Sequence, residues 1–137
     1  MKRVLLYVAL VALGTAVGFA ASSYLSERDY REAARANLLA AGESLRAKDL
    51  VAAMTYAHSA LIGAPDAYDG YEAVGDVYAK FGIASGARSM YQKAIERIEA
   101  DGESAMLVTK GVVSSQNAAE LIRRKLSALG QVNLSAP

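Results

Sequence analysis

The spacing of apolar residues after Leu25 is the feature that most limits the fold of this chain. Apolar side chains recur there at intervals of three or four, as on the buried face of an α-helix, and no stretch alternates as a strand does. Alanine, the strongest helix former, is abundant, and Pro65 is the only proline before the C-terminal residue. We therefore predict an all-α fold.

Short breaks divide this pattern into separate helices. They contain glycine, proline or a capping acid, and they fall at Lys48–Asp49, Gly63–Asp66, Phe81–Gly82 and Asp101–Gly102. Such residues end helices or begin new ones. The last helix is predicted to begin near Ser115–Asn117, with Asn117 and Glu120 as a capping box. The sequence thus predicts short helices joined by tight turns.

The pattern repeats along the chain at a fixed interval. Ala53, Ala60 and Leu61 correspond to Ala87, Ala94 and Ile95 at a shift of 34. Upstream of the first turn a shift of 33 aligns Gly42 with Gly75, which implies that one residue is lost near Asp49. A helix–turn–helix period of about 34 residues is the signature of tetratricopeptide repeats.

The second unit resembles a tetratricopeptide repeat in its large–small–large pattern. It reads Tyr71-x2-Val74-Gly75-x2-Tyr78, then Gly82 at the turn, then Ala87-x3-Tyr91-x2-Ala94. The first unit matches less well, since Asn37 or Leu38 stands where the first aromatic residue is expected. A third, degenerate unit is predicted from Glu103 to Leu129. The resemblance implies a TPR-like array of two to three repeats over residues 36–129.

An uncharged apolar run extends from Val4 to Ala21. As a helix it is about 27 Å long, close to the roughly 30 Å of a hydrocarbon core. Tyr24 follows it, where aromatic side chains commonly mark the membrane interface. We predict that the run is a single transmembrane helix and that the protein is anchored by it.

The basic residues Lys2 and Arg3 before the run favour an N-terminus in the cytoplasm, with the helical domain on the periplasmic side of the inner (cytoplasmic) membrane. The alternative is a cleaved signal peptide. Gly18-Phe19-Ala20 offers small residues at the −3 and −1 positions of a cut before Ala21. That cut would remove residues 1–20 and leave a secreted periplasmic adaptor.

These observations divide the chain into four parts. We predict a transmembrane anchor over residues 1–23, a helical linker without a helix breaker over 24–35, the TPR-like domain over 36–129, and a C-terminal tail over 130–137. The linker would hold the repeats close to the bilayer.

Composition excludes several classes of function. The chain has no cysteine, so it has no disulfide framework, iron–sulfur cluster or catalytic thiol. A net charge of +1 argues against nonspecific binding to nucleic acid. His58 is the only histidine and lacks partners for a metal site, and the common phosphate-binding and hydrolase motifs are absent. We predict no catalytic, cofactor or metal site and no small-molecule substrate; an enzyme or cofactor carrier is an alternative without a supporting motif.

The tetratricopeptide resemblance implies a concave groove lined by the first helix of each unit. Carried over to this chain, its positions include Leu39, Glu43, Arg46, Asp69, Glu72, Asp76 and Lys80. Asp69, Glu72 and Asp76 share one helical face, which would attract a basic peptide segment. The alternative is a solvated acidic face, favoured by the dipole at a helix N-terminus.

Small residues also recur within the predicted membrane helix. Gly14, Gly18 and Ser22 form a stripe that would let a neighbouring membrane helix approach closely. The neighbour would belong to a partner subunit or to a second copy of the chain. Together these features predict a non-catalytic, membrane-anchored interaction or scaffold subunit whose partners are proteins of a larger membrane complex.

Overall fold

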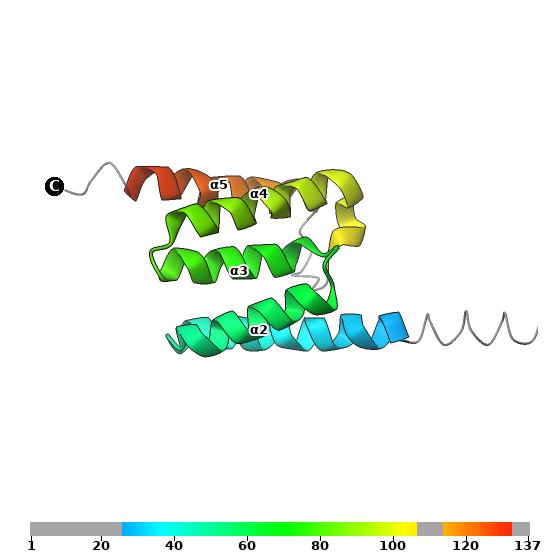
Figure 1. Ribbon diagram of the computed structural model, residues 1–137. Coiled ribbons are helices and arrows are strands. Elements are labelled where there is room, and N and C mark those ends of the chain that lie inside the picture. The colour runs from blue at the N-terminus through cyan, green and yellow to red at the C-terminus, as the bar shows by residue number, and fades with distance from the viewer. Residues whose placement is uncertain (1–25, 107–113, 133–137) are drawn as a thin grey trace, which may run out of the picture.

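The computed structural model describes residues 26–106 and 114–132. All regular structure in these two ranges is helical (Figure 1), which confirms the predicted all-α fold for the described residues. Residues 26–46 form an N-terminal helix. It is followed by α2 (Leu50–Gly63), α3 (Tyr68–Lys80), α4 (Ala84–Asp101), the 3-10 helix η1 (Gly102–Ala105) and α5 (Ser115–Val132).

None of the described helices is long and apolar enough to cross a membrane. The transmembrane anchor that we predict at residues 1–23 lies outside the described residues, and so do Gly14, Gly18 and Ser22 of its small-residue stripe. The described part of the predicted linker, residues 26–35, is helical and continues without a break into residues 36–46. At the other end, α5 includes Gly130, where we predict the tail to begin.

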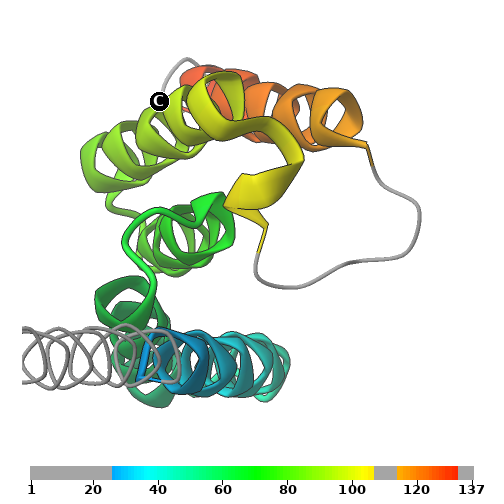
Figure 2. The ribbon, with the colours of Figure 1, turned by 90° about the vertical axis from the view of Figure 1, so that its right-hand side faces the viewer.

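The helices stack as two antiparallel hairpins with α5 added at one end (Figure 1). The N-terminal helix pairs with α2, α3 pairs with α4, and α5 lies alongside α4. Viewed along the helices, the stack is curved (Figure 2). The N-terminal helix, α3 and α5 lie on its concave side, and α2 and α4 lie on its convex side.

The turns of the two hairpins have the same pattern of hydrogen bonds. The amides of Lys48 and Asp49 donate to the carbonyls of Leu45 and Ser44, and those of Gly82 and Ile83 donate to the carbonyls of Ala79 and Tyr78. Lys48 and Gly82 are both left-handed, with φ of 62° and 76°. The shift of 34 therefore continues across the turn. The predicted loss of a residue near Asp49 is wrong, and Gly75 corresponds to Ala41 rather than to Gly42.

Six pairs of positions related by this shift are buried in both hairpins. They are Ala34 and Tyr68, Ala41 and Gly75, Ala53 and Ala87, Ala57 and Tyr91, Ala60 and Ala94, and Ala64 and Ile98. The first hairpin has alanine at every one of them, whereas the second has two tyrosines and an isoleucine. Because these side chains are larger, the second hairpin contains most of the buried apolar volume at the shared positions.

Polar side chains fix where two of the helices begin. The carboxylate of Asp49 accepts a hydrogen bond from the amide of Ala52 at 3.0 Å and caps α2. Helix α5 begins at Ser115, as predicted, but Ser114 caps it: its hydroxyl accepts from the amide of Asn117 at 3.4 Å. The predicted capping box is wrong because Asn117 already lies inside the first turn of α5.

Candidate functional site

A pocket of about 180 Å³ lies between the N-terminal helix and α3. The N-terminal helix forms one wall, which is apolar at Leu38, Leu39 and Leu45 and carries the charge of Arg46 at its end. Helix α3 forms the other wall and carries Asp69, Glu72 and Asp76. Leu39 is 56% exposed, which is high for a leucine and leaves its side chain open to a ligand. The pocket has the size of one amino-acid side chain rather than of a cofactor.

The pocket brings together five of the seven predicted groove residues. They are Leu39, Arg46, Asp69, Glu72 and Asp76. The other two, Glu43 and Lys80, are exposed and do not line it. Asp69 and Glu72 are far less accessible than a solvated acidic face would be, with 5% and 6% of their surface exposed. Burial of this degree requires that carboxylates have partners within the protein.

Lys125 of α5 supplies the partner for two of these carboxylates. Its Nζ donates a hydrogen bond to Oε1 of Glu72 at 2.7 Å and bonds to both Oδ atoms of Asp76 at 2.7 Å. The hydroxyl of Tyr91 donates to Oδ1 of Asp76, also at 2.7 Å. Lys125 Nζ lies 5.8 Å from the centre of the Tyr91 ring, within the range of a cation–π contact. Two of the three carboxylates on the acidic face of α3 are therefore paired with a cation from within the chain.

The charge on Lys125 is secure at neutral pH. Burial alone would lower the pKa of this ammonium, but the negative charges of Glu72 and Asp76 and their hydrogen bonds outweigh burial, so that the pKa is raised. The group stays protonated wherever the domain is folded near pH 7. Lys125 thus holds a positive charge beside Glu72 and Asp76, and Arg46 places a second cation at the wall of the pocket.

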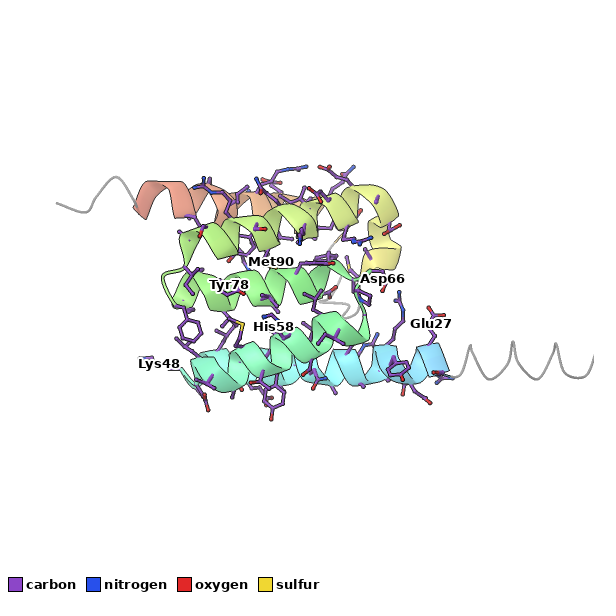
Figure 3. The ribbon with its side chains drawn as sticks, in the orientation of Figure 1. Glu27, Lys48, His58, Asp66, Tyr78 and Met90 are labelled. Carbon is purple, nitrogen blue, oxygen red and sulfur yellow. The ribbon has the colours of Figure 1, made fainter. Side chains whose placement is uncertain are left out.

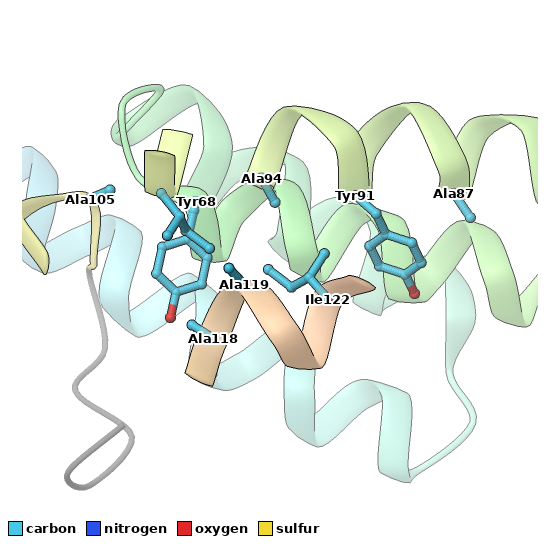
Figure 4. Packing of buried hydrophobic residues seen from close by; sticks show 9 residues of the cluster. Tyr68, Ala87, Tyr91, Ala94, Ala105, Ala118, Ala119 and Ile122 are labelled. Atoms are coloured by element: carbon cyan, nitrogen blue, oxygen red, sulfur yellow. The ribbon is translucent and has the colours of Figure 1, made fainter. Parts of the chain in front are cut away.

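Two tyrosines pack against α5 beside this network. Tyr68 lies near Ala118 and Ala119, and Tyr91 lies near Ile122 (Figure 4). Burial raises the pKa of both phenols. The hydrogen bond to Asp76 raises the pKa of Tyr91 further, because the bond requires the phenol to keep its proton. Both groups resist ionisation in the folded protein.

We expect the domain to become less stable as the pH rises above about 10, the ordinary pKa of tyrosine. Tyr68 and Tyr91 then remain protonated in the folded chain but ionise in the unfolded chain, so the folded state binds more protons and stability falls with pH. Each retained proton contributes a slope of about 1.4 kcal/mol per pH unit. Urea midpoints from pH 8 to 11 measure this slope. The stability of Tyr91→Phe should fall less steeply with pH than that of the wild type. Equal slopes for the two proteins would contradict the assignment.

The sequence interpretation missed Lys125, although its pattern contained a signal. Lys125 lies on the stripe Ala118, Ile122, Lys125 and Leu129, which otherwise faces the core. A lysine on the buried face of a helix requires an opposite charge on the element against which it packs. The acidic face of α3 was the nearest source of such a charge.

His58, the single histidine in the sequence, lies on α2 (labelled in Figure 3), and its side chain is exposed. Comparisons with protein-family models, with curated proteins and with solved structures found no match.

Proposed function

We propose that the chain is a non-catalytic, membrane-anchored protein of tetratricopeptide-like repeats, and that it binds other proteins as an accessory or stabilising subunit of a larger membrane complex. The observation that carries this proposal is the pocket between the N-terminal helix and α3, with its apolar and acidic walls. The two helices that form it lie on the concave side of the stack (Figure 2), where repeat proteins bind their partners.

The repeated geometry of the two hairpins supports the tetratricopeptide-like assignment. Equivalent hydrogen bonds recur in their turns at the same shift as the sequence pattern, and this shift equals the period of that family. In the second hairpin a glycine, Gly75, faces the ring of Tyr91, which is the small–large packing that the resemblance implies. The shared burial of six related positions extends the similarity along both helices.

The contacts of the pocket favour a peptide segment with an exposed apolar side chain as its ligand. Leu38, Leu39 and Leu45 offer apolar surface, and Leu39 is open to solvent. The carboxylates on the α3 wall would steer basic residues toward the pocket without binding them tightly, because two of them are already paired with Lys125. Apolar contact therefore supplies most of the affinity, and charge supplies orientation.

Site-specific photocrosslinking in native membranes tests the proposal. We expect benzoylphenylalanine at Leu39 to give an adduct with one protein in near-stoichiometric yield. The same group at Val51, which is 74% exposed on α2 of the convex side, should give none. Adducts of equal yield at both positions, or none at Leu39, would rule out the pocket as the binding surface.

Intact mass analysis of the same samples separates the two forms of the proposal. An anchored subunit keeps Met1 through Pro137. A secreted periplasmic adaptor lacks about the first 20 residues, as the signal-peptide alternative requires. Recovery of the cleaved form from the membrane-free fraction would replace the anchored form with the adaptor.

A further inference from the structure

Two large apolar side chains are exposed together at one end of the helical stack. Tyr30 of the N-terminal helix is 63% exposed and Ile62 of α2 is 80% exposed. Both line the same open groove, with Pro65 beside them. We call Tyr30, Ile62 and Pro65 the Tyr30–Ile62 patch. Apolar side chains that are exposed side by side, rather than singly, are candidates for a contact surface.

Close packing fixes the patch in place. Gly63 ends α2 against the N-terminal helix so tightly that a Cβ atom there would lie 3.1 Å from Cβ of Ala34 and 3.3 Å from the carbonyl oxygen of Tyr30. Arg31, next to Tyr30, forms an ion pair with Asp66, next to Pro65. The close packing at Gly63 and the ion pair between Arg31 and Asp66 therefore hold Tyr30 beside Ile62 and Pro65.

The position of the patch along the chain points to its partner. It lies at the end of the stack where the described chain begins, the end that carries Glu27 and Asp66 in Figure 3, whereas Lys48 lies at the opposite end. The predicted membrane segment ends at residue 23, only seven residues before Tyr30. A helical path of seven residues would rise about 10 Å, and the polar layer of a bilayer is roughly 5–7 Å thick on each side.

The side chain of Tyr30 closes most of this gap. Helical side chains lean toward the N-terminus of their helix, which for Tyr30 is the direction of the predicted span. Membrane-spanning helices tilt by about 20° on average. A tilt that turns the Tyr30–Ile62 patch toward the lipid brings Ile62 toward the same height above the bilayer as Tyr30. Tyrosine is enriched at membrane interfaces because its ring is apolar and its hydroxyl is polar.

The charges around the patch set the kind of surface that it fits. Residues 26–35 together with Asp66 contain three arginines and four carboxylates. Several of these are paired within the chain, including Arg28 with Glu32 at 3.1 Å and Arg31 with Glu27 at 3.9 Å. Without a cationic excess, attraction to anionic lipid is not expected. Apolar contact with the interface itself is the remaining source of affinity.

From this placement we propose that the Tyr30–Ile62 patch rests in the interfacial layer of a phospholipid bilayer and sets the tilt of the helical domain on the membrane. The proposal rests on the membrane anchor of the proposed function. It adds a lipid contact to the protein contact of the pocket, and the two surfaces lie at different places on the domain.

Tryptophan fluorescence tests the contact without background, because the chain has no tryptophan. Single-tryptophan variants Y30W, I62W and V51W of the full chain are reconstituted into phosphatidylcholine vesicles that carry a nitroxide on the lipid headgroup. We expect strong quenching for Y30W, weaker quenching for I62W and none for V51W. Val51 is as exposed as the patch but lies at the other end of α2, about 16 Å away along the helix.

The outcomes separate this proposal from the anchor on which it rests. Vesicles that carry the chain on flotation but do not quench Y30W and I62W overturn the lipid contact and leave the anchor intact. Equal quenching of V51W overturns the specific orientation. A chain that does not float with vesicles removes the anchor and the lipid contact together. Adding anionic phosphatidylglycerol should not increase quenching, and an increase would show that charge, rather than the apolar patch, binds the surface.

Discussion

Replacing Gly75 with alanine is expected to destabilise the helical domain by up to about 2 kcal/mol, although alanine is the better helix former. A Cβ atom at Gly75 would lie 2.6 Å and 2.7 Å from Cε1 and Cδ1 of the Tyr91 ring. The ring cannot move aside at low cost, because it is 3% exposed and its hydroxyl is bonded to Asp76. Overpacking of this kind costs roughly 1–3 kcal/mol, and the helix propensity of alanine returns about 1 kcal/mol.

Gly42→Ala is the matched control. Gly42 is also a helical glycine one turn from a hairpin turn, but the nearest atom to an added Cβ is Nη2 of Arg46, at 3.9 Å. The substitution there should stabilise the domain by about 0.5–1 kcal/mol, since only the helix propensity changes. Urea unfolding of the full chain, followed by far-ultraviolet circular dichroism, measures both variants.

A double-mutant cycle assigns the effect to the ring. In a Tyr91→Ala background, Gly75→Ala recreates the alanine pair that Ala41 and Ala57 form at the related positions of the first hairpin. We expect the added cost to disappear there, with a coupling free energy of about 1–3 kcal/mol. If Gly75→Ala and Gly42→Ala have the same effect on stability, close packing against Tyr91 is not what requires a glycine at position 75.

This pair of positions also shows how far the sequence could predict the fold. Helical periodicity and turn residues located the described α-helices, because these signals are local in the chain, but they did not predict the 3-10 helix η1. The register between repeats was misassigned by one residue, because matching Gly42 to Gly75 by residue type ignores what each glycine packs against. Ala41 and Gly75 occupy equivalent positions. Gly75 is the smaller residue because its partner Tyr91 is larger than Ala57, the residue related to Tyr91 in the first hairpin. This compensation in size is visible only when the helices are placed together.

The candidate site was predicted in its location but not in its charge. The family resemblance placed Leu39, Arg46 and the α3 carboxylates on one surface, and the structure joins them in one pocket. The partner of that surface was missed, because Lys125 is 49 residues from Asp76 in sequence and reaches it only when α5 packs on the second hairpin. The position of Lys125 on the buried stripe of α5 indicates that it needs an opposite charge, but the sequence alone does not say which carboxylate supplies it.

Replacing Lys125 with methionine is expected to cost about 1–3 kcal/mol of stability, because it removes one partner of a largely buried ion pair. Such a loss costs about 3–5 kcal/mol when the pair is fully buried, and the side chains of Lys125 and Asp76 are still 28% and 32% exposed, which reduces the penalty. Methionine preserves the apolar stem against Tyr91, so the loss reports the charge rather than the packing. Glu72, whose side chain is 8% exposed, would then be left without this cation.

Arg124→Met on the same helix is the control for this change. Arg124 pairs with Glu120 at 2.5 Å, but both side chains are well exposed, at 75% and 59%. Its removal should change stability by no more than about 0.5 kcal/mol. Adding Glu72→Gln to Lys125→Met should recover part of the lost stability. Lys125→Met removes the ammonium beside the buried carboxylate of Glu72, and Glu72→Gln then removes the negative charge of that carboxylate.

The pH dependence of the Lys125→Met effect identifies the ammonium as its source. A folded pKa raised above the unfolded value of 10.5 means that the charge contributes fully below pH 10.5 and is lost only as the pH rises through the folded pKa. The difference between wild type and Lys125→Met should therefore be constant from pH 7 to about 10 and should shrink above that. Urea midpoints across this range measure the difference. The pairing of Lys125 with Glu72 and Asp76 is not what attaches α5 to α3 if the difference in stability between wild type and Lys125→Met already disappears between pH 7 and 9. The same conclusion follows if Arg124→Met loses as much stability as Lys125→Met.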